Sequence, residues 1–315
     1  MCPEVSLRET YGQTLVELGK ENPDIIVLDA DLSQSTMTKF FASEFPDRFF
    51  DCGIAEQNMV VIAAGLASSG KIPFASTFAV FVPGHSFDQI RMSIAQPGLN
   101  VKLASTHSGI TVGEDGTSHQ CIEDLSMICS LPGFTVIVPA DANETAQAVR
   151  AAAASNGPFY IRLCRPNLPL VYDKDYRFDL GKAVTVRPGW ATTIIAIGTM
   201  VAPAVEAASN LQQEGIDCRV LSMSTLKPVD EAAIIRAAAD TGAIVTAEEH
   251  LEHGGLGSII AQITARHRPV PMEFVAMKDT YAISGAPAEL LERYGLSAEG
   301  IEQAVHTVLK KKTKQ

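Results

Sequence analysis

Short apolar runs alternate with helical segments through the first half of the chain. Residues 25–28 form a continuous apolar run, which predicts a buried strand, and residues 57–67 predict a mostly apolar helix. Further apolar runs predict strands at 72–75, 101–104, 135–138 and 160–163. The alanine-rich stretch 143–154 predicts a helix, and the polar residues at 141–144 can cap its free amides. Such alternation is typical of a parallel sheet with helices on both faces.

The periodicity fails between Arg165 and Trp190. Three prolines, Pro166, Pro169 and Pro188, accompany charged and aromatic residues there, and the stretch has no clean strand or helix pattern. An irregular stretch of this kind favours a boundary between domains.

A second α/β series follows this interruption. Strands are predicted at 193–197, 218–221, 243–247 and 272–275, and helices at 202–214, 231–239 and 256–265. We therefore predict an α/β fold of two tandem domains with mainly parallel sheets. The first domain is expected at 1–170, a linker at 171–189 and the second domain at 190–315.

Composition and charge narrow the class of protein. The chain has 315 residues, of which 46% are hydrophobic, so it can bury the cores of two domains. Its formal charge of -11 gives no electrostatic footprint for nucleic acid. The six cysteines form no C-x-x-C pair, which fits a reducing compartment. The longest apolar run, at 59–67, is too short to span a membrane, and the start of the chain has no leader pattern, so we expect a cytoplasmic protein.

One carboxylate, Glu56, stands at the start of the apolar segment 57–67. In one interpretation it caps free amides at the positive end of the helix dipole. In the other it is buried against a ligand nitrogen, with which it shares a proton. This segment alone leaves both interpretations open.

Four separated segments resemble the transketolase family. They are GIAEQNM at 53–59, STF at 76–78 with Phe81, the block 106–120 with its THSG, VGEDG and HQ motifs, and RPNLP at 165–169. The resemblance runs from Arg8 into the last predicted domain. It implies a pyrimidine-binding thiamine diphosphate domain followed by a transketolase C-terminal domain, and thus the carboxyl-terminal half of a split transketolase.

The resemblance implies the residues that bind the coenzyme. Glu56 would bind the N1′ nitrogen of the aminopyrimidine of thiamine diphosphate and activate it, while Phe78 and Phe81 would stack around that ring. Ile54 and Asp31 occupy further positions that the family places near the cofactor. Without the resemblance, two phenylalanines at this spacing are more often part of a core.

The sequence departs from the family at Gly84, where a tyrosine is common. The tyrosine contact is therefore in doubt. Either the pyrimidine pocket is more open here, or a neighbouring side chain such as His85 or Phe87 fills the space.

The segment 106–120 predicts a glycine-containing loop without periodicity, either around a polar site or as a polar surface turn. The resemblance implies that His107 reaches the substrate phosphate, that Asp115 binds the C2 hydroxyl, and that His119 acts catalytically near the reacting carbon. Arg8, Ser35 and Arg165 match the family's other phosphate contacts. Guanidinium groups suit this task because they donate paired hydrogen bonds to phosphate oxygens.

One part of the family's site is missing. The family holds Mg²⁺ and the diphosphate with a Gly-Asp-Gly segment and a later asparagine, which supply hard oxygen ligands. The only imitation here, residues 114–116 with Asn143, already matches the sugar site, so we predict no metal ligand in this chain. We expect a partner subunit to hold both groups, in an α2β2 assembly. From the start at Met1 we expect a natural boundary; a piece of a longer chain is the alternative.

A cluster of acids and histidines lies at 248–255, with the sequence EEHLEHGG. It could bind a metal ion, but we predict a solvated loop that caps the next helix.

Three classes of function remain for the whole chain. The expected reaction is transfer of a two-carbon ketol unit between sugar phosphates, as in the pentose phosphate pathway. A second hypothesis is half of a deoxyxylulose-phosphate synthase or the beta subunit of a 2-oxoacid dehydrogenase. A third is a catalytically inactive scaffold.

Overall fold

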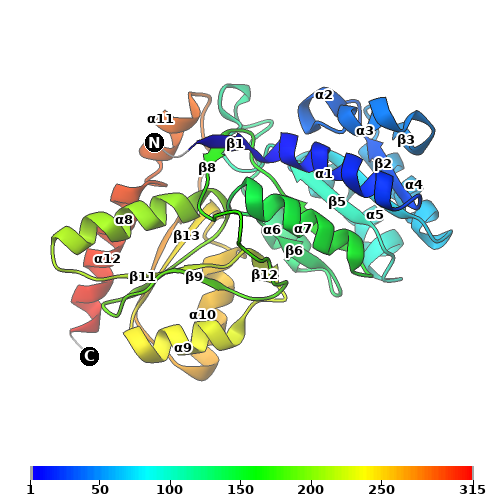
Figure 1. The fold of residues 1–315 in the computed structure, drawn as a ribbon. Helices are drawn as coiled ribbons and strands as arrows, with labels where there is room; N and C mark the ends of the chain where they lie inside the picture. The colour runs from blue at the N-terminus through cyan, green and yellow to red at the C-terminus, as the bar shows by residue number, and fades with distance from the viewer. Residues whose placement is uncertain (1–2, 314–315) are drawn as a thin grey trace.

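A seven-stranded sheet lies at the centre of the first half of the molecule, within residues 3–313 that the computed structural model describes (Figure 1). Its strand order is β12-β6-β7-β5-β4-β2-β3. The strands are β2 (Ile25–Asp29), β3 (Phe49–Asp51), β4 (Ile72–Phe78), β5 (Lys102–Thr106), β6 (Thr135–Ile137), β7 (Phe159–Arg162) and β12 (Thr225–Lys227). All neighbours are parallel except β12, which pairs antiparallel with β6. The parallel strands predicted from apolar runs are confirmed.

Helices cover both faces of this sheet. They are α1 (Leu7–Glu21), α2 (Ser33–Thr36), α3 (Lys39–Glu44), α4 (Glu56–Ser68), α5 (Phe81–Gln89), α6 (Asp124–Cys129) and α7 (Ala142–Ala154), with short turns η1 (Pro46–Arg48), η2 (Ile90–Ala95) and η3 (Gly113–Asp115). The predicted capping of α7 is confirmed, because the Asp141 carboxylate accepts a hydrogen bond from the Glu144 amide at 2.8 Å. Across the described residues, no helix is both long enough and apolar enough to cross a membrane.

The second half has its own sheet, with the strand order β14-β13-β10-β11-β9. The strands are β9 (Val184–Arg187), β10 (Thr193–Ala196), β11 (Arg219–Ser222), β13 (Ile244–Leu251) and β14 (Met272–Met277). The helices are α8 (Val201–Gln213), α9 (Glu231–Thr241), α10 (Leu256–His267), α11 (Pro287–Arg293) and α12 (Ala298–Lys312), with η4 (Gly198–Met200). Only β9 runs antiparallel among the described strands of this sheet. The predicted pair of tandem α/β domains with mainly parallel sheets is confirmed.

The stretch predicted as an irregular linker contains a strand. β9 pairs with β11 of the second sheet, and just before the linker β8 (Asn167–Pro169) pairs antiparallel with β1 (Glu4–Ser6). The segment of β9 alternates apolar and polar residues, and Val184 and Val186 pack against the second core. The pattern is four residues long and Pro188 follows it closely, so the surrounding irregular sequence obscures it.

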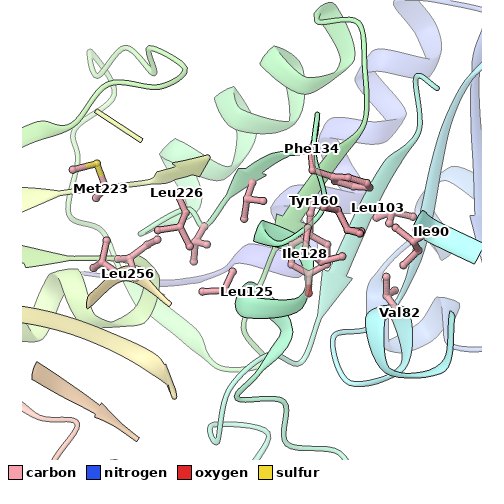
Figure 2. Packing of buried hydrophobic residues seen from close by; sticks show 14 of the residues in the cluster. Val82, Ile90, Leu103, Leu125, Ile128, Phe134, Tyr160, Met223, Leu226 and Leu256 are labelled. Atoms are coloured by element: carbon pink, nitrogen blue, oxygen red, sulfur yellow. The ribbon is translucent and has the colours of Figure 1, made fainter. Parts of the chain in front are cut away.

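The two halves share an apolar core. One cluster of buried side chains contains Val82 and Leu103 from the first half and Met223, Leu226 and Leu256 from the second (Figure 2). Halves joined through a continuous core do not move freely against each other, because separation would expose that surface to water.

The prediction of a solvated loop at 248–255 is wrong for its first residues. Glu248, Glu249 and His250 belong to β13 and are 0%, 1% and 0% exposed. The predicted helix cap is present, since the Glu248 carboxylate accepts hydrogen bonds from the amides of Leu256 at 2.7 Å and Gly257 at 2.8 Å. These polar groups tolerate burial because each has hydrogen-bond partners, which a polar sequence pattern does not reveal.

Candidate active site

The predicted site residues gather at one edge of the first sheet. β2 ends two residues before Asp31, β4 ends at Phe78, and β5 ends one residue before His107. β7 ends three residues before Arg165. The carboxyl ends of parallel strands meet at one edge, which is where open α/β sheets bind ligands.

Aromatic rings form a continuous stack at this edge. Phe78 lies between His107, at a centroid distance of 3.8 Å, and Phe81, at 5.8 Å. His85 stacks on the other side of Phe81 at 5.0 Å. The ring of His119 meets both phenylalanines edge-on, at 6.2 Å from Phe78 and 5.6 Å from Phe81. Face and edge contacts of this kind fix ring orientation, so the stack is a defined wall.

The Glu56 carboxylate lies at the far end of this wall. It is the first residue of α4, is 6% exposed, and its Oε2 lies 3.3 Å from Nδ1 of His85. Glu56 lies in the first turn of α4, but among the described residues its carboxylate pairs with His85 and with no free backbone amide, so the interpretation of Glu56 as a cap of free amides is wrong. The residues 54–58 and His85 line a cavity of ≈ 360 Å³ beside the carboxylate. A buried acid that faces a cavity and makes no cap is available for a ligand.

The surroundings of Gly84 explain the missing tyrosine. A Cβ atom at Gly84 would meet no described atom within 4 Å, so the site is open there. His85 stacks on Phe81, whereas Phe87 packs against the core of the two halves. Of the two neighbours considered, His85 lies at the site. The sequence analysis left His85 and Phe87 as alternatives. It could not decide between them, because the direction of a side chain at a helix start depends on its packing.

The loop 106–120 brings His107, Asp115 and His119 to the same edge. Cys121 closes its base in an isolated bridge with Gly109. His107 is 4% exposed and has a φ of 57°, a left-handed conformation that a non-glycine residue adopts only when its surroundings impose it. Its Nδ1 lies 2.9 Å from the Thr106 hydroxyl. Asp115 is exposed, and His119 is half-buried.

The predicted phosphate contacts lie together. The Arg8 guanidinium donates to the backbone oxygens of Ser35 at 2.7 Å and of Arg165 at 3.2 Å. Arg165 in turn donates to the backbone oxygen of Val112, and lies 3.7 Å from a carboxylate oxygen of Asp115. Arg8, Ser35 and Arg165 thus lie at one place, although 157 residues separate the two arginines in sequence. The structure thus brings together Arg8, Ser35 and Arg165, which lie far apart in the sequence.

Burial and neighbouring cations keep His107 neutral. Burial, together with smaller contributions from Arg8, Arg165 and His119, lowers the pKa of His107 to about 3. A neutral imidazole adds a hydrogen-bonding group to the cationic region without adding a charge. The two arginines therefore carry the positive charge of this region.

The pKa of His107 predicts a measurable pH dependence of stability. The unfolded histidine binds a proton near pH 6.5, whereas the folded one binds it near pH 3. Its contribution to stability is therefore complete above about pH 6.5 and is lost as the pH falls toward 3, with a slope of about 1.4 kcal/mol per pH unit. We expect His107→Gln to be less pH-sensitive than the wild type in urea unfolding between about pH 6 and 4.5. Identical slopes for the two proteins would contradict the neutral, buried state of His107.

A buried aspartate that the sequence analysis missed supports Asp31 and Ser35. The Asp29 carboxylate accepts hydrogen bonds from the Leu32 amide at 2.6 Å and from the Thr36 and Thr38 hydroxyls at 2.7 and 2.8 Å. Burial raises the pKa of Asp29 to about 6. One signal in the sequence pointed to Asp29: it follows the apolar run 25–28, and the threonines Thr36 and Thr38 come soon after it. Asp29 fixes the turn on which Asp31, with a φ of 61°, lies.

Among residues 3–313, no group of three or more His, Cys, Asp or Glu side chains is arranged to hold a metal ion. The acids of the block 114–116 face Arg165 instead. The residues present fit one end of a coenzyme: an aromatic wall, a buried carboxylate and a cavity would accept a pyrimidine ring with a basic nitrogen.

Two family models match consecutive parts of the chain. The model described as "Transketolase, pyrimidine binding domain" matches residues 3–171. The model described as "Transketolase, C-terminal domain" matches residues 181–301. Together they account for both halves of the fold.

Individual proteins are similar over nearly the whole chain. A solved structure titled "Split gene transketolase, inactive beta4 tetramer" is 49% identical, with a TM-score of 0.91 over 98% of this chain and 100% of that one. The 6-deoxy-6-sulfo-D-fructose transketolase subunit of Clostridium sp. (strain MSTE9) is 41% identical over 97% of this chain and 95% of that protein. An apulose-4-phosphate transketolase subunit of Phocaeicola vulgatus is 38% identical over 98% of each. The chain therefore belongs to the transketolase family, in which it corresponds to the carboxyl-terminal section that split transketolases carry as a separate subunit.

Proposed function

We propose that this chain is the carboxyl-terminal half of a two-subunit, thiamine-diphosphate-dependent transketolase that transfers a two-carbon ketol unit between sugar phosphates. One observation carries the proposal: the buried Glu56 carboxylate and the ring stack open on the same sheet edge as the Arg8, Ser35 and Arg165 cluster. A site for a heterocyclic base and a site for an anion thus lie side by side.

One group of residues in this chain would contact the coenzyme, and another would contact the substrate. When bound, thiamine diphosphate supplies the carbanion chemistry that breaks and forms the carbon–carbon bond. Glu56 would hold a proton at the pyrimidine N1′ nitrogen, and Phe78, Phe81 and Ile54 would orient the ring. Asp31, with a φ of 61°, donates its amide to the Asp51 carboxylate, which also accepts a hydrogen bond from the Gly53 amide just before Ile54.

The opposite end of the site would hold the sugar phosphate. Arg8 and Arg165 would neutralise the phosphate, and Ser35 and the neutral His107 would add hydrogen bonds. Asp115 would bind the C2 hydroxyl, and His119, whose ring meets the phenylalanine stack edge-on, would act near the reacting carbon. An arginine pair accepts any tetrahedral anion, which is consistent with relatives named for a sulfonated and a phosphorylated sugar.

The surface around Glu56 supports a need for a partner subunit. Ile54 is 83% exposed, and Val61 and Ile62 on α4 are 47% and 37% exposed. Ile54 lines the cavity, and Val61 and Ile62 lie on the helix that begins beside it; exposed apolar side chains of this kind indicate a surface that another polypeptide covers. We propose that an amino-terminal subunit covers it, holds the diphosphate and Mg²⁺, and forms an α2β2 assembly. The name of the related beta tetramer, which describes it as inactive, agrees with a chain that requires such a partner.

The function is tested by reconstitution. The chain is mixed with its amino-terminal partner, thiamine diphosphate and Mg²⁺, and xylulose 5-phosphate and ribose 5-phosphate are supplied. Products two carbons longer and shorter, formed only with both subunits, are the expected result. Turnover that requires pyruvate would replace the proposal with a deoxyxylulose-phosphate synthase. Tight assembly without turnover of any donor would favour the hypothesis of a catalytically inactive scaffold. Turnover by the chain alone would contradict a site shared between two subunits.

Arg165→Ala is expected to weaken binding of phosphorylated sugars specifically. Loss of a charged hydrogen-bond donor to phosphate costs about 1.5–3 kcal/mol, which corresponds to an increase in KM of about 10–150-fold. The kcat at saturation is expected to change less, since the arginine binds a part of the substrate that does not react. The exposed Arg177 is the matched control, and Arg177→Ala should behave as the wild type. An equal loss with a donor that lacks phosphate would contradict the assigned role.

A further inference from the structure

A carboxylate of the second half holds the loop that carries three of the candidate substrate residues. Glu249, near the end of β13, is 1% exposed. Its Oε1 accepts a hydrogen bond from the Thr111 amide at 2.7 Å, and its Oε2 accepts one from the Thr199 hydroxyl at 2.9 Å. Thr111 lies between His107 and Asp115, four residues from each. The carboxylate therefore links the second half directly to the middle of the substrate-side loop.

The close approach of Glu249 requires a glycine in the loop. A Cβ atom at Gly109 would lie 2.1 Å from Oε1 of Glu249, and Gly109 has a φ of +76°. Both the space and the conformation therefore disfavour a side chain at this position. The Glu249 carboxylate occupies the space that a side chain at position 109 would fill.

The base of the loop is held by the same strand. The buried Arg162 guanidinium donates to the backbone oxygens of Cys121, at 3.2 Å, and Glu249, at 3.1 Å. The Leu251 amide donates to the Ile122 oxygen at 2.8 Å. The end of β13 thus contacts the loop at its base as well as at Thr111.

A second segment of the second half contacts the tip of the loop. The Thr117 hydroxyl donates to the Ala282 oxygen at 2.7 Å, and the Gln120 amide group donates to the Ile283 oxygen at 3.0 Å. The Gly116 Cβ position would lie 2.3 Å from the Ser284 hydroxyl oxygen. Apart from the short turn η3, the loop between His107 and Gln120 has no regular structure of its own. Its position therefore depends on these contacts together with its contacts to the first half, such as the hydrogen bonds from the Ser108 amide to the Leu163 oxygen and from Arg165 to the Val112 oxygen.

We propose that Glu249 is a positioning residue for the transfer reaction, through which the second half sets the placement of His107, Asp115 and His119. The inference rests on the proposed function for its kinetic consequence. The second half contains none of the predicted site residues. The inference assigns it a role in substrate binding, which it exerts through its contacts with this loop of the first half.

Glu249→Ala is expected to move the loop while the fold persists. The substitution leaves the buried Thr111 amide without an acceptor, so the loop must shift to find one. In the assembled enzyme with thiamine diphosphate and Mg²⁺, the KM for the phosphorylated donor should rise about 10-fold or more, with a smaller change in kcat. Glu249→Gln should restore most of the wild-type KM, because its amide oxygen accepts from Thr111 and its amide group donates to Thr199.

Hydrogen exchange gives a measurement independent of activity. In the assembled complex of Glu249→Ala, peptides that cover 106–120 should exchange faster than in the wild type, while peptides from β2 should be unchanged. Glu214→Ala is the control, since this exposed glutamate of the second half pairs with His306 and makes no hydrogen bond to the loop. Thr199→Val, which removes only one partner of the carboxylate, should produce a weaker effect in the same peptides.

The outcomes separate this inference from the proposed function. An active wild type with an unchanged KM and unchanged exchange in Glu249→Ala would overturn the positioning role. Faster exchange throughout the chain, with lower kcat at constant KM, would show a general structural role and overturn it as well. If Glu249→Ala fails to assemble, the Thr199→Val variant tests the inference instead. Hydrogen exchange at 106–120 that is as slow in Thr199→Val as in the wild type would then overturn the inference. Absence of ketol transfer by the wild-type complex would reject the proposed function, while the exchange experiment would still report on the loop.

Discussion

Glu56→Gln is expected to lower kcat by about 10²–10⁴-fold, the range for loss of a group that transfers a proton in the transition state. Glutamine has nearly the shape of glutamate and retains a hydrogen-bonding oxygen, so the cavity and the contact with His85 should persist. It cannot hold the shared proton at a pyrimidine nitrogen as a carboxylic acid does. The loss should therefore fall on turnover, with little effect on subunit assembly or on the KM for sugar phosphates.

The control for this variant is an acid of the same half. Glu44→Gln removes an exposed carboxylate that lies 3.6 Å from Lys20, and its kcat should equal that of the wild type. The measurements are steady-state turnover of the assembled complex and its mass in solution. A fully active Glu56→Gln enzyme would refute the role proposed for this carboxylate, whatever the other residues do.

Arg162→Met is expected to destabilise the chain by about 3–5 kcal/mol. Arg162 and Asp124 are 4% and 0% exposed, and two hydrogen bonds of 2.7 and 3.1 Å join them. Burial alone would raise the pKa of Asp124, but Arg162, together with His250 and Tyr160, outweighs it and holds that pKa below its usual value. Removal of the guanidinium leaves the carboxylate buried without a counter-charge. It also removes the donor to the backbone oxygens of Cys121 and Glu249.

Urea unfolding of Arg162→Met and of the double variant Arg162→Met/Asp124→Leu tests this prediction. The double variant should recover part of the lost stability, because no uncompensated charge is left in the interior. A loss below about 1 kcal/mol in the single variant would show that the pair is not buried as described. Equal losses in both variants would show that the backbone contacts, and not the charge, account for the effect.

Strands and helices were predictable wherever the chain buries one continuous apolar run. The runs at 25–28 and 160–163 became β2 and β7, because a strand covered on both faces needs apolar residues at every position. The acids of β13 were not predictable as buried residues. The burial of Glu249 depends on Arg162, Thr111 and Thr199, which are distant in sequence, and a local pattern contains no information about such partners.

The candidate site was predictable as a set of residues but not as an arrangement. The motifs named Glu56, Phe78, His107 and Arg165, and all of them lie at one sheet edge. The contact between His85 and Glu56 was not predictable, because it depends on how α5 begins against α4. The motifs identify which functional groups the site contains, whereas packing determines which neighbouring side chains contact those groups.

Strand β12 ties the two halves together through main-chain bonds. It follows the second half's strand β11 in sequence, yet it pairs with β6 at the margin of the first sheet, where Thr225 aligns with Ile137. A hybrid chain in which everything after residue 190 came from another homologue would thus also acquire a foreign edge on the first sheet. The two halves would therefore have to fit each other at this edge, and a chain without the second half would leave main-chain groups of β6 unpaired.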